Sequence, residues 1–154
     1  MEEIISRLRR FTPLIPAAAM FLLMPGRAAE PDPKAVHYTL PDKIDWRKSE
    51  ASDSATLQGD PSKPGIYIQL IKWHPGHMSR PHFHSTERYI TVLSGTWWIG
   101  TGNKYDPAST YPVPAGTYVV DVAGGVHYDG AKDTECVLEI VGMGPMTTTQ
   151  AEAK

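Results

Sequence analysis

Two histidines stand two residues apart in the stretch PHFHSTERYITVLSG, residues 81–95. On a β-strand, side chains two positions apart lie on the same face, so the imidazoles of His82 and His84 would point to one place. Two neutral imidazoles directed at one point are a good beginning for a divalent transition-metal site. The same spacing also suits two solvent-exposed histidines on a strand, so the pair alone leaves both interpretations open.

A third histidine follows after a second glycine-containing stretch. The first stretch has the spacing G-x5-H-x-H, which ends at His84 and is followed by Gly95, and the second has the spacing G-x5-V-x-G-x2-H, which ends at His127. Over roughly residues 65–142 the two stretches together resemble the two sequence motifs of the cupin family. The resemblance implies a jelly-roll β-barrel in which His82, His84 and His127 converge on one metal ion.

Three positions depart from the cupin pattern. Arg88 stands where the family has a glutamate ligand, since its distance to Gly95 keeps the family spacing, and Val122 and Ala131 replace a proline and an asparagine of the second motif. The arginine replaces a residue that binds the metal in the family, so this departure affects the metal site directly. The other two positions in the family shape a turn and a supporting contact, so these changes are mild.

The direction in which Glu87 and Arg88 point depends on the strand that carries them. A regular strand running on from His82 would turn Arg88 inward with the histidines and Glu87 outward. A bulge at residues 85–86 would shift the register and bring Glu87 to the metal instead. The unchanged spacing to Gly95 favours the regular strand, in which Glu87 has at most a supporting role beside the ligands.

An inward Arg88 close to a metal cation would be repelled unless a negative charge lay between them. One interpretation is that Arg88 binds an anionic or chelating substrate. The other is that it pairs with a carboxylate of the chain, such as Asp121 or Glu139. One of the adjacent residues Trp97 and Trp98 should face inward, where it would fill the core or, as a further candidate at Trp97, contact a substrate. Asp129 is a candidate for orienting the His127 imidazole, with a plain turn after the strand as the alternative.

A site of three histidines without glutamate is also found in cupin-like dioxygenases that act on thiols or β-diketones. This resemblance implies iron(II) as the cofactor and an oxidoreductase acting on a small substrate, with zinc, nickel, manganese or copper as other possible metals. The alternative is a non-catalytic cupin that binds a small molecule or a metal. A hydrolase or isomerase is a weaker interpretation, because the motifs hold no Ser-His-Asp signature and no carboxylate pair.

The elements that would position these residues are short strands. Apolar and β-branched stretches separated by Gly, Pro, Asn and Asp predict strands at residues 65–73, 87–95, 96–102, 117–122 and 135–142. We therefore expect an all-β, single-domain protein with a barrel core over residues 65–142. Residues 29–64 are expected to form a lead-in with a short strand near 36–40 and a loop over 51–65, and residues 143–154 a flexible tail.

The first 28 residues are different in kind. A basic stretch with three arginines precedes an apolar run over residues 14–24, and small residues stand at positions 26 and 28. This pattern predicts a secretory signal peptide, hence an exported, periplasmic or secreted protein with no stable membrane span after cleavage. A membrane anchor is the alternative, although the apolar run is short and contains a proline.

Charge and cysteine content restrict the partners. A net charge of −2 argues against nucleic-acid binding, which needs a basic surface. The single cysteine, Cys136, stands in an apolar strand-like run and predicts a buried thiol with no internal disulfide. We expect a small-molecule substrate, and a homodimer that protects the sheet edges.

Overall fold

The computed structural model describes residues 28–153. The chain divides into one unit that ends at His37 and a second that begins at Tyr38 and contains every strand. In the first unit, residues 28–37 hold a turn in which the amides of Ala35 and Val36 donate to the carbonyl of Asp32. The predicted signal peptide lies, but for its last position, outside the described residues. Over residues 28–153 the structure has no helix that is long and apolar enough to cross a membrane.

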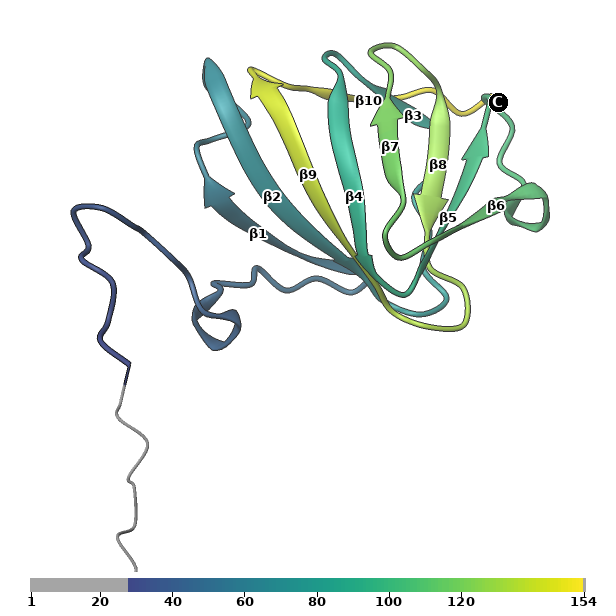
Figure 1. Ribbon diagram of the computed structural model, residues 1–154. Coiled ribbons are helices and arrows are strands. Elements are labelled where there is room, and N and C mark those ends of the chain that lie inside the picture. Colours follow the sequence, from purple (N-terminus) through teal and green to yellow (C-terminus); the bar gives the residue numbers. More distant parts are fainter. Residues whose placement is uncertain (1–27, 154) are drawn as a thin grey trace, which may run out of the picture. The chain divides into compact units, whose positions relative to one another are not determined.

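The second unit consists of two five-stranded antiparallel sheets (Figure 1). In spatial order the first sheet contains β1 (Ser52–Gln58), β2 (Gly65–Trp73), β9 (Cys136–Gly144), β4 (Arg88–Ser94) and β7 (Tyr118–Asp121). The second contains β10 (Thr148–Gln150), β3 (His82–His84), β8 (His127–Gly130), β5 (Thr96–Thr101) and β6 (Tyr111–Pro114). Two 3-10 turns, η1 (Pro41–Lys43) and η2 (Pro107–Ser109), complete the regular structure. The all-β prediction is confirmed.

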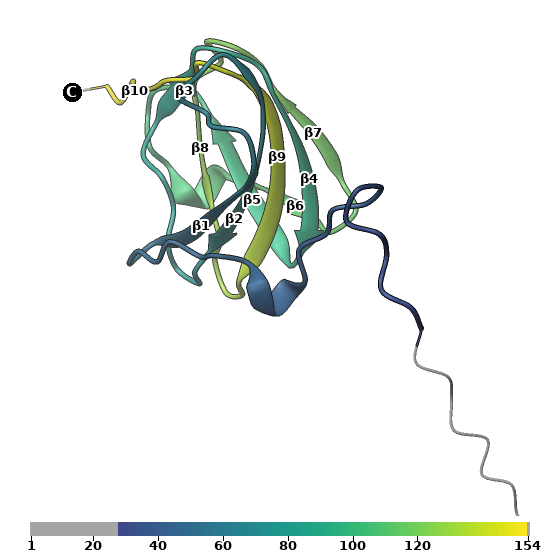
Figure 2. The same ribbon diagram turned by 90° about the vertical axis from the view of Figure 1, so that its left-hand side faces the viewer.

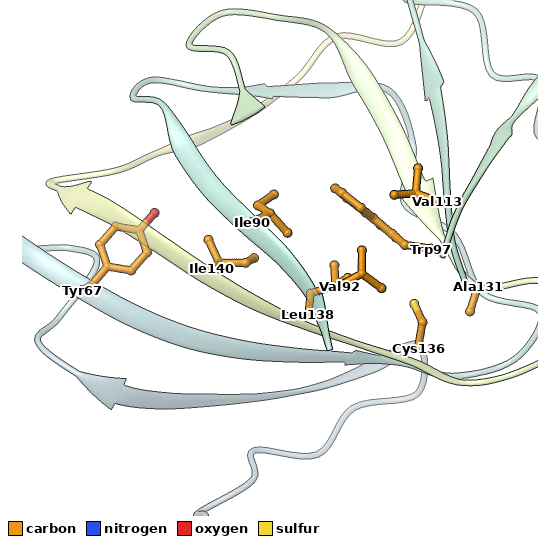
Figure 3. Close-up of a cluster of buried hydrophobic side chains, with 9 residues drawn as sticks. All are labelled: Tyr67, Ile90, Val92, Trp97, Val113, Ala131, Cys136, Leu138 and Ile140. Atoms are coloured by element: carbon orange, nitrogen blue, oxygen red, sulfur yellow. The ribbon is translucent and has the colours of Figure 1, made fainter. Parts of the chain in front are cut away.

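The two sheets face each other across one hydrophobic core. In Figure 2, β9, β4 and β7 lie on one side and β10, β3 and β8 on the other. Alternate residues of β4 and β9 are buried, as the period of two along a strand requires. Figure 3 shows the buried cluster, which consists of Tyr67, Ile90, Val92, Trp97, Val113, Ala131, Cys136, Leu138 and Ile140. The prediction of a buried Cys136 is confirmed.

Three sequence-based expectations about local structure were wrong. The loop expected over residues 51–65 contains β1, which pairs along most of β2 although its sequence is polar. The short strand expected near residues 36–40 does not form, and its apolar side chains are about half exposed because no strand pairs with them. The tail expected to be flexible from residue 143 holds the end of β9 and all of β10, which pairs with β3.

The path of the chain between His84 and Arg88 also differs from the regular strand that we expected. His84 ends β3 in one sheet, Arg88 begins β4 in the other, and residues 85–87 make the crossing. Arg88 nevertheless points into the interior and Glu87 is exposed. The expected directions were therefore right, but a change of sheet and not strand alternation produces them.

Candidate metal centre

The structure brings His82, His84 and His127 together inside the barrel. His82 and His84 lie at the two ends of β3, and His127 on β8 is the direct cross-strand partner of His82. The three rings have centroids 4.4 to 5.4 Å apart, and one nitrogen of each ring lies within 4.8 Å of the others. All three residues are buried. Two adjacent strands of one sheet thus present three nitrogen donors to one point.

Hydrogen bonds fix the orientation of two of these rings. The Nδ1 atom of His82 donates to the carbonyl of Arg80 at 2.8 Å, and that of His127 donates to the carbonyl of Gly125 at 3.0 Å. A neutral imidazole that carries its proton on Nδ1 has a free lone pair on Nε2. The backbone two residues before each histidine therefore selects the tautomer that a metal ligand needs.

The C-terminal strand β10 orients the third ring. Thr148 Oγ1 lies 3.0 Å from His84 Nδ1 and 3.9 Å from the sulfur of Met146, to which its hydroxyl donates. With its hydrogen directed at the sulfur, the threonine oxygen is free to accept from His84 Nδ1. The Nε2 atom of His84 then also has a free lone pair, and the ring is in the same tautomer as those of His82 and His127.

The environment keeps the imidazoles of His82 and His84 neutral. Burial lowers the pKa of His84 to about 2, and the positive charge of Arg88 contributes to the shift. Burial also lowers the pKa of His82, against the opposing effects of the Arg80 carbonyl and Asp129. Only neutral imidazoles bind metals, so these two rings are ready to coordinate a cation without first losing protons.

Two of the three Nε2 atoms, those of His84 and His127, are buried and have no hydrogen-bond partner among the described residues. Buried polar atoms without a partner cost free energy, and natural proteins rarely leave two beside each other. A divalent transition metal bound by the three Nε2 atoms would satisfy both, and imidazole suits zinc, copper, iron and nickel. The donor set therefore fits a metal ion but does not select which one.

Arg88 pairs with Asp121, its cross-strand partner on β7. Its Nε and Nη2 atoms both reach Asp121 Oδ2, at 2.7 and 2.6 Å, and both side chains are largely buried. Of the two interpretations of Arg88, the structure supports the pairing with a carboxylate of the chain. Glu139, the other proposed partner, is the neighbour of Thr91 on β4 instead.

Asp121 also borders the histidines, and the sequence did not predict this position. Its Oδ2 atom lies 3.8 Å from His84 Nε2, and its Oδ1 atom lies 3.4 Å from His127 Nδ1. No motif points to this residue, because its position depends on the pairing of β7 with β4. The arginine in the glutamate's place was the one available signal, since a buried arginine needs a carboxylate partner.

Asp129 lies beside His82, and not beside His127 as we had expected. Its Oδ1 atom accepts from Ser79 Oγ at 2.8 Å and lies 4.0 Å from His82 Nε2. Its Oδ2 atom accepts from Trp97 Nε1 at 2.8 Å. Trp97 is 2% exposed, so it is the inward-facing one of the two adjacent tryptophans, and its indole helps to fix a buried carboxylate at the cluster.

Glu87 is not brought to the imidazoles. Its carboxylate is exposed and accepts from the hydroxyl of Tyr89 at 3.1 Å. The supporting role that the sequence suggested for Glu87 is therefore corrected: the carboxylates next to the histidines are Asp121 and Asp129.

Two cavities adjoin the cluster. The central cavity has a volume of about 240 Å³, and its walls include His82, His84, Arg88, Asp129 and Gln150. The side cavity, of about 270 Å³, is mostly apolar, with valines of β7 in its walls and Asp121 and His127 among its lining residues. Trp97 lines both cavities. The histidines can therefore be approached through a cavity of mixed polarity and through an apolar one.

No protein-family model matches this sequence, and no curated protein matches it either. Solved structures do match. The polyketide cyclase RemF from Streptomyces resistomycificus aligns with a TM-score of 0.64 and 17% identity, over 77% of this chain and 87% of that one. A sugar phosphate isomerase of the cupin superfamily from Silicibacter pomeroyi aligns with a TM-score of 0.57 and 17% identity, over 73% of this chain and 80% of that one.

A third similar structure is the DMSP lyase DddQ from Ruegeria pomeroyi, with a TM-score of 0.56 and 14% identity, over 72% of this chain and 64% of that one. At these identities the likeness extends to the fold and not to the activity. The two facing antiparallel sheets, the ordered pair of motifs and these structural matches lead to one conclusion: this chain has the cupin fold, with a buried three-histidine cluster inside it.

Proposed function

We propose that the protein is a metal-dependent enzyme that binds a small molecule in the central cavity and moves a proton on it. The observation that carries this proposal is the arrangement of three buried histidines, each with one ring nitrogen within 4.8 Å of the others, with two buried carboxylates beside them. A divalent metal held by His82, His84 and His127 would act as a Lewis acid that polarises an oxygen of the substrate.

Asp129 is the residue best placed to exchange a proton with a molecule in the central cavity. It lines that cavity, and Ser79 and Trp97 hold both of its oxygens in place. A fixed carboxylate next to a Lewis-acid site can take a proton from a substrate carbon or oxygen and return it elsewhere. Arg88 lines the same cavity, where its charge is paired with that of Asp121.

The size of the central cavity supports a small substrate. Its volume of about 240 Å³ lies below the range of roughly 300–1,000 Å³ that is usual for ligand pockets. The structural neighbours include proteins named as a cyclase, an isomerase and a lyase. The activities that these names describe are compatible with proton transfer in a cupin barrel, although the shared fold by itself assigns none of them to this chain.

Oxygen-dependent oxidation is the second candidate. All three donors come from the neighbouring strands β3 and β8, so they approach a metal from one side and leave the side facing the cavity open. An open face next to iron(II) is what a dioxygenase needs to bind a chelating substrate and dioxygen together. This candidate keeps the same ligands and differs in the metal and the reaction.

One set of assays separates the two candidates. Protein loaded with zinc, manganese or iron(II) is incubated without air in heavy water with small hydroxy-carbonyl and diketone compounds, and deuterium uptake is followed by NMR. Oxygen consumption is followed in parallel with iron(II). Deuterium uptake that His82→Ala abolishes supports proton transfer. Oxygen uptake coupled to product supports oxidation, and a protein that neither binds metal nor reacts would refute both.

We also propose that the protein is exported after removal of residues 1–28. The support for this proposal is the sequence pattern alone. Amino-terminal sequencing of the protein from a periplasmic fraction would test it, with a mature chain starting at residue 29 as the expected result. An uncleaved chain recovered from the membrane fraction would favour an anchor instead.

A further inference from the structure

The fold places a carboxylate beside the metal cluster at the point where the motif has lost one. Arg88 occupies the position of the cupin glutamate at the start of β4, and Asp121 ends β7 directly opposite it. A carboxylate therefore still reaches the interior, but it comes from the neighbouring strand β7 and not from β4.

Two distances show how close Asp121 comes to the cluster. Its Oδ2 atom is 3.8 Å from His84 Nε2, one of the two orphaned nitrogens, and its Oδ1 atom is 3.4 Å from His127 Nδ1. Two ligand atoms on one metal, each about 2.1 Å from it, lie roughly 3 to 4 Å apart. The separation of Asp121 Oδ2 from His84 Nε2 falls in this range, although Asp121 is not among the residues whose ligand atoms all lie within 4.8 Å of one another.

Arg88 accounts for the position of this carboxylate. Both guanidinium contacts are made to Oδ2, which is also the oxygen nearer to His84 Nε2, while Oδ1 lies beside His127 Nδ1. The arginine thereby holds the side chain against the cluster.

We infer that Asp121 replaces the missing glutamate as the carboxylate ligand of the metal site and that Arg88 is the positioning residue that holds it there. The inference rests on the proposed metal site and extends it from three donors to four. The resulting site has three neutral nitrogens and one negative oxygen, which lowers the net charge of a bound divalent ion from two to one.

Cobalt(II) binding to the metal-free protein tests this assignment. Cobalt(II) reports its affinity by titration calorimetry and its ligand set by its visible absorption. In Asp121→Asn we expect an affinity at least about tenfold lower, together with a changed cobalt spectrum. Glu87→Gln is the matched control, because Glu87 is an exposed carboxylate next to Arg88 that does not reach the cluster, and it should leave both unchanged.

A second variant covers the case in which Asp121→Asn leaves Arg88 unpaired and the protein unfolds. The double variant Arg88→Gln/Asp121→Asn removes both charges and keeps two groups that can hydrogen-bond, so it should fold and show the same loss of affinity and the same spectral change. A folded variant with wild-type cobalt affinity and spectrum would overturn the inference. A wild-type protein that binds no cobalt would instead overturn the metal site itself, so the two failures are distinguishable.

Discussion

At the scale of single residues, the chemistry of this protein depends on keeping three imidazoles correctly oriented in a closed space. Backbone carbonyls hold the Nδ1 atoms of His82 and His127, and Thr148 holds that of His84. Burial keeps the imidazoles of His82 and His84 neutral, because a charged imidazole is poorly solvated inside the barrel. At low pH this site therefore lowers the stability of the folded, metal-free protein.

This cost predicts a pH-dependent stability. His84 has a pKa of about 2 in the folded chain and an ordinary value of 6.5 when exposed, so below pH 6.5 the unfolded chain binds a proton that the folded chain does not. The stability of the metal-free protein should be complete above pH 6.5 and fall as the pH drops below it, by up to about 1.4 kcal/mol per pH unit for this one residue.

Urea denaturation of metal-free protein between neutral pH and pH about 5 measures this slope. The variant His84→Gln should show a clearly shallower slope over the same range, because ordinary carboxylates titrate mainly below it. Equal slopes for the variant and the wild type would show that His84 does not titrate as described.

The sequence could predict the three ligands but not their carboxylate neighbours. The spacing of His82, His84 and His127 follows two motifs that each lie within a short stretch of chain. Asp121 reaches the cluster only through the register of β7 against β4, and Asp129 reaches His82 through contacts of β8 with residue 79 and β5. Such pairings depend on contacts across 30 to 50 positions, which no local pattern encodes.

At the scale of elements, the short C-terminal strand β10 has a large influence on the site. β10 is three residues long, pairs only with β3, and carries both Thr148 at His84 and Gln150 in the wall of the central cavity. Beyond it, the Arg80 guanidinium and the Glu152 carboxylate form an ion pair that ties the end of the chain to the residues before β3. The C-terminal segment is therefore part of the support of the metal site.

Substitution of Thr148 by valine tests this role. Thr148→Val keeps the size and the branching of the side chain but removes the oxygen that accepts from His84, so the ring should lose its fixed orientation. We expect metal affinity about tenfold lower, as is usual when an outer partner of a ligand is removed. Thr149→Val is the control, since Thr149 is exposed and lies opposite Phe83, and it should bind metal as the wild type does. Equal metal affinities of the two variants would contradict the role of Thr148.

Element prediction succeeded where the strand was apolar and failed where it was not. The stretches 65–73 and 135–142 are dense in Ile, Val and Leu and form β2 and β9. β1 and β10 have the sequences SDSATLQ and TTQ, and each becomes a strand because it lies along the edge of a neighbour that supplies backbone partners. Tertiary pairing outweighs intrinsic preference at such edges.

At the scale of the whole molecule, the outer face of the first sheet is unusually apolar. Register places Ile68, Val141, Tyr89 and Val120 in one row across β2, β9, β4 and β7. Tyr89 and Val120 are each 42% exposed. We propose that a second copy of this chain covers this row, in keeping with the homodimer that the sequence led us to expect, because contiguous exposed apolar surface of this kind marks an interface.

Sedimentation of purified protein tests the dimer. The wild type should sediment as a dimer at micromolar concentration, and Tyr89→Lys should sediment as a monomer because it places a charge within the apolar row. Tyr111→Lys is the control, since Tyr111 is 73% exposed on β6 of the other sheet, and it should remain dimeric. A monomeric wild type would exclude this interface.

The central claim is that His82, His84 and His127 together bind one divalent metal ion, and a metal titration of the chelator-treated protein tests it most directly. We predict that zinc and cobalt bind with a stoichiometry of one per chain, and that His82→Ala, His84→Ala and His127→Ala each reduce the affinity by at least about a hundredfold while the fold is retained. The control His77→Ala, at a histidine outside the cluster, should bind as the wild type does. Wild-type affinity in any one of the three variants, or no binding by the wild type, would contradict the account.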